Sequence, residues 1–221
     1  MDVRAGGYRV RLVSGDEAGA AFALRARLFR DGRDDSDAFD ADARHLLVER
    51  DGLAACARLS VLEGDAILAG YTGNRYDLTR FAARFDRALE VGRICLLPEA
   101  ADPDLARVML GAIAHVATAT GAAALFGCAS FPPNGAGTER LGGYVAPPEW
   151  RPGRRDGAVP LPGVPGPLPP MLRGYLTFGA AVSDHAVRDD DLDTLHVFTA
   201  LPVATIPTAR ARRLTQLLHP A

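Results

Sequence analysis

The sequence contains no lysine, because all 25 of its basic residues are arginines. Without lysine the chain cannot form a Schiff base with a carbonyl substrate or place an ammonium group in a phosphate-binding loop. Enzymes that depend on either group are therefore excluded. With 27 acidic residues against 25 basic ones, the 221-residue chain also lacks the positive excess expected of a protein that binds nucleic acid through its whole surface.

Cysteine and histidine are scarce, and neither shows the spacing of a metal site. Cys56, Cys95 and Cys128 lie in separate apolar stretches, and His45 and His115 stand alone. Metal sites usually show pairs such as Cys-x-x-Cys, so we predict no bound metal. The odd number of thiols, with no basic-then-apolar leader at the start of the sequence, predicts a cytoplasmic location.

Charge is missing from residues 108–138, which contain no Asp, Glu or Arg. Such a run resembles a membrane span, but it is broken by Gly121 and by two prolines that begin at Pro132. We therefore predict a helix followed by a buried strand, and no transmembrane segment.

The composition, 48% hydrophobic and 24% charged, is that of one soluble globular domain covering residues 1–221. Eleven of the 16 prolines lie within residues 132–170, which we predict to be an irregular excursion rather than a packed unit. The order of the expected elements predicts a mixed α/β sheet. Strands are predicted at 8–13, 45–49, 53–61, 89–97, 122–131, 182–187 and 194–201, and helices at 16–30, 77–89, 104–120, 171–178 and after Pro207.

Charged residues gather around a loop at residues 31–42, which holds six aspartates. Arg25 precedes this loop on a helix face that is otherwise apolar, where an unpaired charge is costly. A carboxylate of Asp37, Asp40 or Glu90 is therefore expected beside Arg25. From spacing alone, this group is either a substrate site or a structural ion-pair network.

The spacing Arg-x-x-x-Phe, Asp-x-x-Asp, a strand Arg and Glu-x-x-Arg resembles that of acyl-homoserine-lactone synthases, which have the acetyltransferase-like (GNAT) fold. Those enzymes place a tryptophan between the Phe and the Asp pair, and residues 30–36 hold no aromatic residue. The wider sequence is more similar to bacterial ornithine N-acyltransferases, over roughly residues 8–200. Five blocks carry this resemblance, at residues 24–48, 89–96, 125–131, 146–150 and 169–180.

The resemblance implies a GNAT-like mixed central sheet flanked by helices. It also implies transfer of a 3-hydroxyacyl chain from acyl carrier protein to the α-amino group of ornithine, giving lyso-ornithine lipid. No cofactor would be bound, because the donor's phosphopantetheine is carried on the carrier protein. The alternatives are lactone synthesis, acylation of another amino acid, and a non-catalytic acyl-carrier or lipid-binding module. The residues implied to bind substrate are Arg25, Phe29, Asp37, Asp40, Arg58 and Arg93.

An amine that attacks a thioester must lose a proton, and the carbonyl oxygen needs a hydrogen-bond donor as it becomes an oxyanion. Glu90, beside an expected bulge at Val91 and Gly92, is predicted to meet both needs. The alternative for Glu90 is a structural ion pair with Arg93 or Arg58.

Coenzyme-A-dependent members of this fold carry a glycine-rich turn after the bulged strand, where backbone amides hold the pyrophosphate. The corresponding residues 97–104 contain no glycine and three carboxylates, which favours a carrier-protein donor. Carrier proteins are acidic, so an arginine-rich face is expected to bind one. The first candidate is Arg80, Arg84 and Arg87 on one helix face, the second is Arg151, Arg154 and Arg155, and a merely solvated helix face is the alternative.

The product is amphiphilic, so residues 207–218 are expected either to touch the membrane surface transiently or to form a docked terminal helix.

His185 and Asp190 match the His-x4-Asp motif of glycerol-phosphate acyltransferases, but in so acidic a segment we attribute the match to chance. Cys128 and Ser130 lack the surroundings of a nucleophile elbow and are expected to be core strand residues.

Overall fold

The computed structural model describes residues 1–100, 102–207 and 218. Within it the chain forms two compact units, and each unit is assembled from segments far apart in the sequence. Strands β4 and β5 run from one unit into the other. Of the described residues, the first unit comprises 1–61, 91–100, 102–121, 207 and 218, and the second comprises 62–90 and 122–206.

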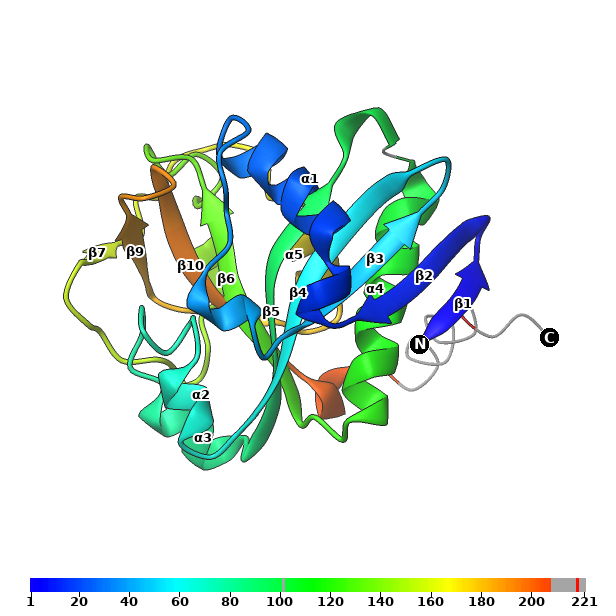
Figure 1. Ribbon diagram of the computed structural model, residues 1–221. Helices are drawn as coiled ribbons and strands as arrows, with labels where there is room; N and C mark the ends of the chain where they lie inside the picture. The colour runs from blue at the N-terminus through cyan, green and yellow to red at the C-terminus, as the bar shows by residue number, and fades with distance from the viewer. Residues whose placement is uncertain (101, 208–217, 219–221) are drawn as a thin grey trace. The chain divides into compact units, whose positions relative to one another are not determined.

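The first unit contains antiparallel strands in the order β1-β2-β3-β4. Figure 1 shows helices α1 and α4 on opposite sides of these strands. The elements are β1 (Asp2–Ala5), β2 (Tyr8–Val13), α1 (Gly19–Phe29), β3 (Arg44–Glu49), β4 (Leu53–Glu63), the last part of β5 (Arg87–Leu96) and α4 (Pro103–Ala119), with 3-10 turns at Gly15–Glu17, Ala38–Asp40 and Pro98–Ala100.

Local chemistry explains most of these boundaries. In β2 the buried residues Tyr8 and Val10 alternate with more exposed arginines, as predicted for a half-buried strand. Helix α4 begins after Asp102, whose side chain accepts a 2.7 Å hydrogen bond from the Leu105 N–H, and it ends before Gly121 at φ 67°. Both predicted elements are therefore confirmed.

The core of the first unit forms between α1 and the strands. Ala18, the residue that caps α1, and Ala21 and Leu24 of α1 pack in one buried cluster with Leu47 of β3 and Cys56 of β4. These residues recur at the three- and four-residue spacing of one helix face, so α1 buries that face against the sheet. The same face carries Arg25, which is 1% exposed.

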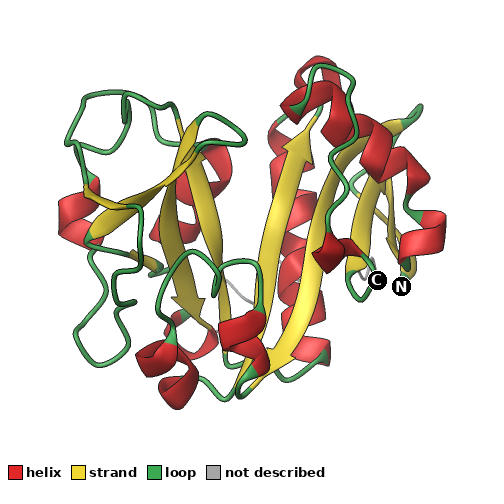
Figure 2. Cartoon of the chain, turned by 60° about the vertical axis from the view of Figure 1, so that its left-hand side comes forward, coloured by secondary structure: helices red, strands yellow, loops and turns green. Residues whose placement is uncertain are grey.

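The second unit contains β5, β6, β10, β9 and β7 in that order, and β8 pairs with β10. β5 and β6 are parallel, whereas the other pairs are antiparallel. Loops occupy much of this unit (Figure 2). Its remaining elements are α2 (Ala66–Ala69), α3 (Thr79–Arg84), β6 (Ala124–Phe131), β7 (Ala158–Pro160), α5 (Pro170–Thr177), β8 (Ala181–Val182), β9 (His185–Asp189) and β10 (Thr194–Pro202), with 3-10 turns at Leu141–Tyr144 and Val203–Thr205.

The predicted helix over residues 77–89 is wrong in its second half. Helix α3 ends at Arg84, and Phe85 takes an extended backbone with ψ 85°. Strand β5 then begins at Arg87, and its residues Ala88 and Leu89 pair with β6. Apolar residues at 81, 85 and 89 fit a helical period, but 85 and 89 also fit the alternation of a strand, and pairing with β6 decides between them.

Residues 132–170 contain little regular structure, but they contribute side chains to the core of the second unit. Trp150 is 7% exposed and packs against Phe81 and Phe85, with ring centroids 6.2 and 5.6 Å apart. Two backbone hydrogen bonds, of 3.1 and 2.8 Å, join Asp77 and Gly153. The prolines therefore fix the path of a segment whose aromatic and apolar side chains complete the core of the second unit.

No helix among the described residues combines the length and apolarity that a membrane crossing requires. The expected terminal helix and membrane-contact segment at residues 207–218 fall almost entirely on residues 208–217, which lie outside the described part of the chain.

Candidate functional site

In the first unit, the buried Arg25 is held by two aspartates of the acidic loop. Its Nη1 and Nη2 atoms donate to the two carboxylate oxygens of Asp40 at 2.6 and 2.9 Å. Its Nε and Nη2 donate to the side chain and carbonyl of Asp35 at 2.9 and 2.6 Å. The expected carboxylate partner of Arg25 is therefore present, and the fork geometry of a guanidinium suits this paired arrangement.

The loop itself is shaped for this contact by a capping box. The Asp37 side chain accepts from the Phe39 N–H at 2.9 Å, and the Asp40 side chain accepts from the Asp37 N–H at 2.8 Å. These bonds turn the chain through the short 3-10 helix, so the Asp40 carboxylate faces Arg25.

Further arginines join the same aspartates. Arg58 of β4 donates to Asp37 at 2.5 Å and to Asp40 at 3.2 Å. Arg93 of β5 lies 3.1 Å from Asp37 and 3.0 Å from Asp35. We call Arg25, Arg30, Asp35, Asp37, Asp40, Arg58 and Arg93 the ion-pair cluster.

The ion-pair cluster shifts the titration of its members. Burial opposes ionisation of Asp40, but the hydrogen bonds from Arg25 outweigh it and lower the pKa of Asp40 to about 2. Asp40 therefore stays ionised across the physiological range. Burial also lowers the pKa of His45, whose ring packs edge-on against Phe22 at a centroid distance of 5.2 Å.

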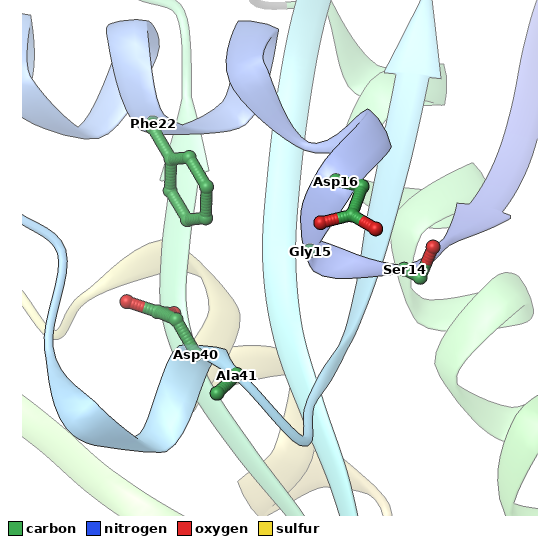
Figure 3. Close-up of a pocket in the computed structure, with 6 residues that line it drawn as sticks. All are labelled: Ser14, Gly15, Asp16, Phe22, Asp40 and Ala41. Atoms are coloured by element: carbon green, nitrogen blue, oxygen red, sulfur yellow. The ribbon is translucent and has the colours of Figure 1, made fainter.

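A hollow of about 360 Å³ opens beside the ion-pair cluster in the first unit. Figure 3 shows the Phe22 ring and the Asp40 carboxylate on one side of it and the exposed Asp16 on the other. The backbone around Gly15 and Ala41 completes its lining. Because Arg25 already occupies the Asp40 carboxylate, this hollow offers little chemistry of its own.

The residues that the sequence predicts to bind substrate differ in exposure. Arg25, Asp40 and Arg58 are buried, whereas Phe29 is 36% exposed and the Asp37 side chain is 23% exposed. Asp35, which meets three arginines and is 2% exposed, was missed, because one aspartate among six in a loop gives no distinguishing signal.

Strand β5 carries an unusual backbone at the expected bulge. The sequence pointed to Gly92, but the left-handed conformation belongs to Arg93, at φ 49°. A non-glycine residue in this region is uncommon and needs surroundings that hold it there. The contacts of Arg93 with Asp35 and Asp37 supply them.

In the second unit, Glu90 is 6% exposed and its carboxylate is held by the backbone. The N–H of Thr72 donates to one oxygen at 2.6 Å, and the N–H of Tyr71 donates to the other at 3.3 Å. A carboxylate can accept about four hydrogen bonds, so two accepting positions stay available. Arg58 and Arg93 pair with aspartates of the ion-pair cluster in the first unit.

Cys128 of β6 lies beside this carboxylate. Its thiol is 3.9 Å from the Thr72 hydroxyl. Burial, and after it the negative charge of Glu90, raise the pKa of Cys128 to about 12. A thiol that stays protonated is a poor nucleophile. Cys128 is partly buried, whereas Ser130, also expected in the core, is exposed.

The arginines predicted to bind a carrier protein do not form one helix row. Arg80 lies on α3 and donates to the Pro148 carbonyl at 3.2 Å, and Arg84 ends the helix. Arg87 lies on β5 and is paired with Glu63. All three are exposed, but they come from two different elements.

The His-x4-Asp match does not correspond to a pair in space. His185 Nδ1 lies 2.6 Å from Asp184, and Asp190 is exposed. A second histidine, His196, instead pairs with Asp189 at 3.1 Å. Over the described residues, no three His, Cys, Asp or Glu side chains are grouped so as to hold a metal ion.

Comparison with known proteins identifies the relatives of this chain. Residues 20–110 match the family described as an acetyltransferase (GNAT) domain. The L-ornithine N(alpha)-acyltransferases of Agrobacterium fabrum and Rhizobium meliloti are each 28% identical to the chain, over 78% of its length and 68% of theirs. The enzyme of that name from Brucella abortus is also 28% identical, over 71% of its own length. The resemblance read from the sequence is thus confirmed.

Solved structures show the same fold. A CoA-dependent acyl-homoserine lactone synthase, BjaI, matches 97% of this chain and 92% of its own with a TM-score of 0.57, at 12% identity. FeeM, an N-acyl amino acid synthase from uncultured soil microbes, matches 96% of this chain and 98% of its own with a TM-score of 0.51, at 13% identity. The chain is therefore an acyltransferase with the GNAT fold, related to the enzymes named L-ornithine N(alpha)-acyltransferase.

Proposed function

We propose that this acyltransferase moves a 3-hydroxyacyl chain from acyl carrier protein to the α-amino group of ornithine, giving lyso-ornithine lipid. The similarity to three L-ornithine N(alpha)-acyltransferases, over 78% of the chain, carries this proposal. Because the two units are built from interleaved segments and share β4 and β5, we assign both to one catalytic domain.

The reaction needs no covalent enzyme intermediate. The amine nitrogen forms a bond to the thioester carbon, the carbon–sulfur bond breaks, and the thiol leaves. The ammonium form of the acceptor releases two protons in all, one to the leaving sulfur and one to solvent. Glu90 is proposed as the group that takes a proton from the amine, since its buried carboxylate keeps free accepting positions.

The backbone that follows Glu90 is proposed to stabilise the oxyanion. Val91 and Gly92 lie just before the left-handed Arg93, where the regular strand geometry is interrupted. A backbone N–H at such a point can donate to the thioester oxygen as negative charge develops there.

The ion-pair cluster is proposed to shape the substrate site. Arg25, Asp40 and Arg58 are buried and bonded to one another, so their role is to fix the loop. Asp37, a more exposed member of the cluster, and Phe29, the exposed last residue of α1, are proposed to contact substrate directly. Arg93, through its contacts with Asp37, links this loop to β5.

The donor is proposed to be a carrier-protein thioester. Before α4, where coenzyme-A-dependent enzymes hold the pyrophosphate, the Asp102 carboxylate accepts bonds from Tyr8, Arg50 and the Leu105 N–H. These contacts lower the pKa of Asp102 to about 2, the Tyr8 hydroxyl contributing most. A fixed negative charge at the helix N-terminus opposes binding of a pyrophosphate there.

Arg80, Arg84 and Arg87 are proposed to bind the acidic carrier, with Arg151, Arg154 and Arg155 as the second candidate surface. Both groups are on the second unit, and Arg84 contacts the Phe85 ring at 5.2 Å rather than a carboxylate. Because the product is amphiphilic, we propose that the enzyme works in the cytoplasm, at the membrane's inner surface.

The decisive experiment supplies purified protein with acylated carrier and a mixture of amino acids, and identifies products by mass spectrometry. N-acyl-ornithine as the main product supports the proposal. A lactone or another acyl amino acid as the main product would instead identify the enzyme as a lactone synthase or as an acyltransferase for that amino acid. Carrier binding without turnover would indicate a non-catalytic module. The same acyl group on coenzyme A is the matched donor control, and equal kcat/KM for both donors would contradict the carrier-protein preference.

A further inference from the structure

The polypeptide segment that holds Glu90 is itself fixed to strands β9 and β10. Tyr71 and Thr72, the two donors to Glu90, begin a turn that continues to Tyr76. The Tyr76 hydroxyl donates to the His196 carbonyl at 2.8 Å and accepts from the Phe198 N–H at 3.1 Å. The end of the turn is therefore fastened to β10 at His196.

The beginning of the same turn reaches the same place by a different route. The Tyr71 hydroxyl donates to Asp189 at 3.4 Å, and the Arg75 guanidinium lies 3.7 Å from that carboxylate. Asp189 in turn is 3.1 Å from His196 Nε2. A continuous path of polar contacts thus joins His196, Asp189 and Tyr71 to Glu90.

The register of the strands places the two ends of this path on one face of the sheet. Glu90 lies beside Phe126, and His196 lies beside Ser130, four residues further along β6. Alternate residues of a strand share a face, and directly paired residues point the same way. Glu90, Cys128 and His196 therefore all point to the face that the turn covers.

Burial makes this pair unlike an ordinary surface ion pair. Asp189 is 1% exposed and His196 is 2% exposed. A buried pair of polar groups seldom stabilises a fold more than well-packed apolar residues of the same size would. The connection of this pair, through Tyr71, to the carboxylate proposed as the base is better explained by control of geometry.

The turn also fits closely against Glu90. Gly70 has an ordinary backbone, but a Cβ there would lie 2.8 Å from Leu62 and 3.2 Å from a Glu90 oxygen. The space between the turn and the carboxylate is thus full, and a small shift of the turn would move Glu90.

We propose that Asp189 and His196 are positioning residues for Glu90, acting through Tyr71 and Thr72. This inference rests on the proposed role of Glu90 in acyl transfer. Loss of the imidazole donor frees the Tyr71 end of the turn, so the two N–H groups no longer hold the carboxylate in one orientation. Misplacement of a reacting group by about 1 Å can cost about 100-fold in rate.

The test compares His196→Leu, which removes the donor, with His196→Gln, whose amide nitrogen replaces Nε2. We expect His196→Leu to lower kcat about 10- to 100-fold with little change in KM for the carrier, and His196→Gln to restore most of that loss. Asp189→Asn should resemble His196→Leu. Asp190→Asn is the matched control, because it makes the same change of charge at the exposed residue next to Asp189, and it should leave kcat unchanged.

A readout without substrate separates positioning from stability. Hydrogen exchange of the Thr72 amide, followed by NMR, reports its bond to Glu90 directly. Exchange should quicken in His196→Leu and Asp189→Asn but not in His196→Gln or Asp190→Asn. If His196→Leu fails to fold, Asp189→Asn and Gly70→Ala apply the same test.

Two results would overturn the inference: normal turnover and Thr72 protection in folded His196→Leu, or a folded His196→Gln no better than His196→Leu. Failure of the wild-type protein to acylate ornithine would instead reject the proposed function, while the exchange measurement would still report on the turn.

Discussion

Buried carboxylates have different bonding partners in the ion-pair cluster and around Glu90. Asp35 and Asp40 face guanidinium groups, so their charge is neutralised within the protein. Glu90 is bonded by two backbone N–H groups, which orient the carboxylate but carry no net charge. A carboxylate paired with guanidinium groups contributes to the stability of the fold. A carboxylate oriented by backbone N–H groups can still bind a cationic substrate.

The sharpest test of this contrast is Glu90→Gln. The amide keeps an oxygen that can accept from Thr72, so the thermal midpoint should fall only slightly. A general-base role predicts a turnover lower by about 100- to 10,000-fold, with carrier binding little changed. Turnover and thermal midpoint are measured on one preparation. Activity per folded molecule that survives the substitution would move the base to Asp37 or Asp40.

The opposite outcome is expected for Arg25→Met. Asp35 and Asp40 would each lose the guanidinium that binds them most extensively, so the free energy of unfolding should fall by about 3–5 kcal/mol. Chemical denaturation measures this loss. Arg27→Met is the matched control on the same helix, because Arg27 pairs with Glu99 in solvent and should change stability little. An equal loss of unfolding free energy in the two variants would mean that the buried ion pairs of Arg25 stabilise the protein no more than an exposed ion pair does.

Acid should weaken the first unit through Asp40. The folded pKa of Asp40 is about 2, below the value of about 3.9 expected in the unfolded chain. Its contribution, about 2 kcal/mol, is present above pH 4 and is lost as pH falls through about 2. The free energy of unfolding, measured by chemical denaturation at several pH values in this range, should fall more steeply with decreasing pH in wild type than in Asp40→Asn. The same pH dependence in both proteins would show that other carboxylates dominate.

The smallest effect is expected for replacing Arg80, Arg84 and Arg87 together by Gln. These exposed residues should steer an acidic carrier, so the KM for the carrier should rise and its dependence on salt should flatten. The same replacement of Arg151, Arg154 and Arg155 is the comparison. An unchanged salt dependence in the first variant would move the carrier surface to the second group.

Elements defined by local signals could be predicted from the sequence. β2 shows clear alternation, and α4 lies between a capping aspartate and a glycine, so neither depends on distant residues. β1 was missed because its four residues carry no pattern of their own. It forms because Gly6 and Gly7, both with positive φ, turn it back onto β2.

Long-range pairings account for the rest. Arg25 was expected to meet a carboxylate because a buried charge must be paired, and that argument needs no structure. The identity of Asp35 as a partner, and the pairing of His196 with Asp189 rather than His185 with Asp190, depend on which strands lie side by side. The spacing of residues along the chain does not say which strands are neighbours in the sheet.

The buried Trp150 gives the protein a built-in optical reporter. It is the sole tryptophan in the sequence, and it lies against Phe81 and Phe85 in the second unit. Its emission therefore follows the packing of one unit only, whereas far-ultraviolet circular dichroism follows the backbone of both. Coincident transitions by the two signals would mean that both units unfold together, and an earlier shift in emission would mean that the second unit loosens first.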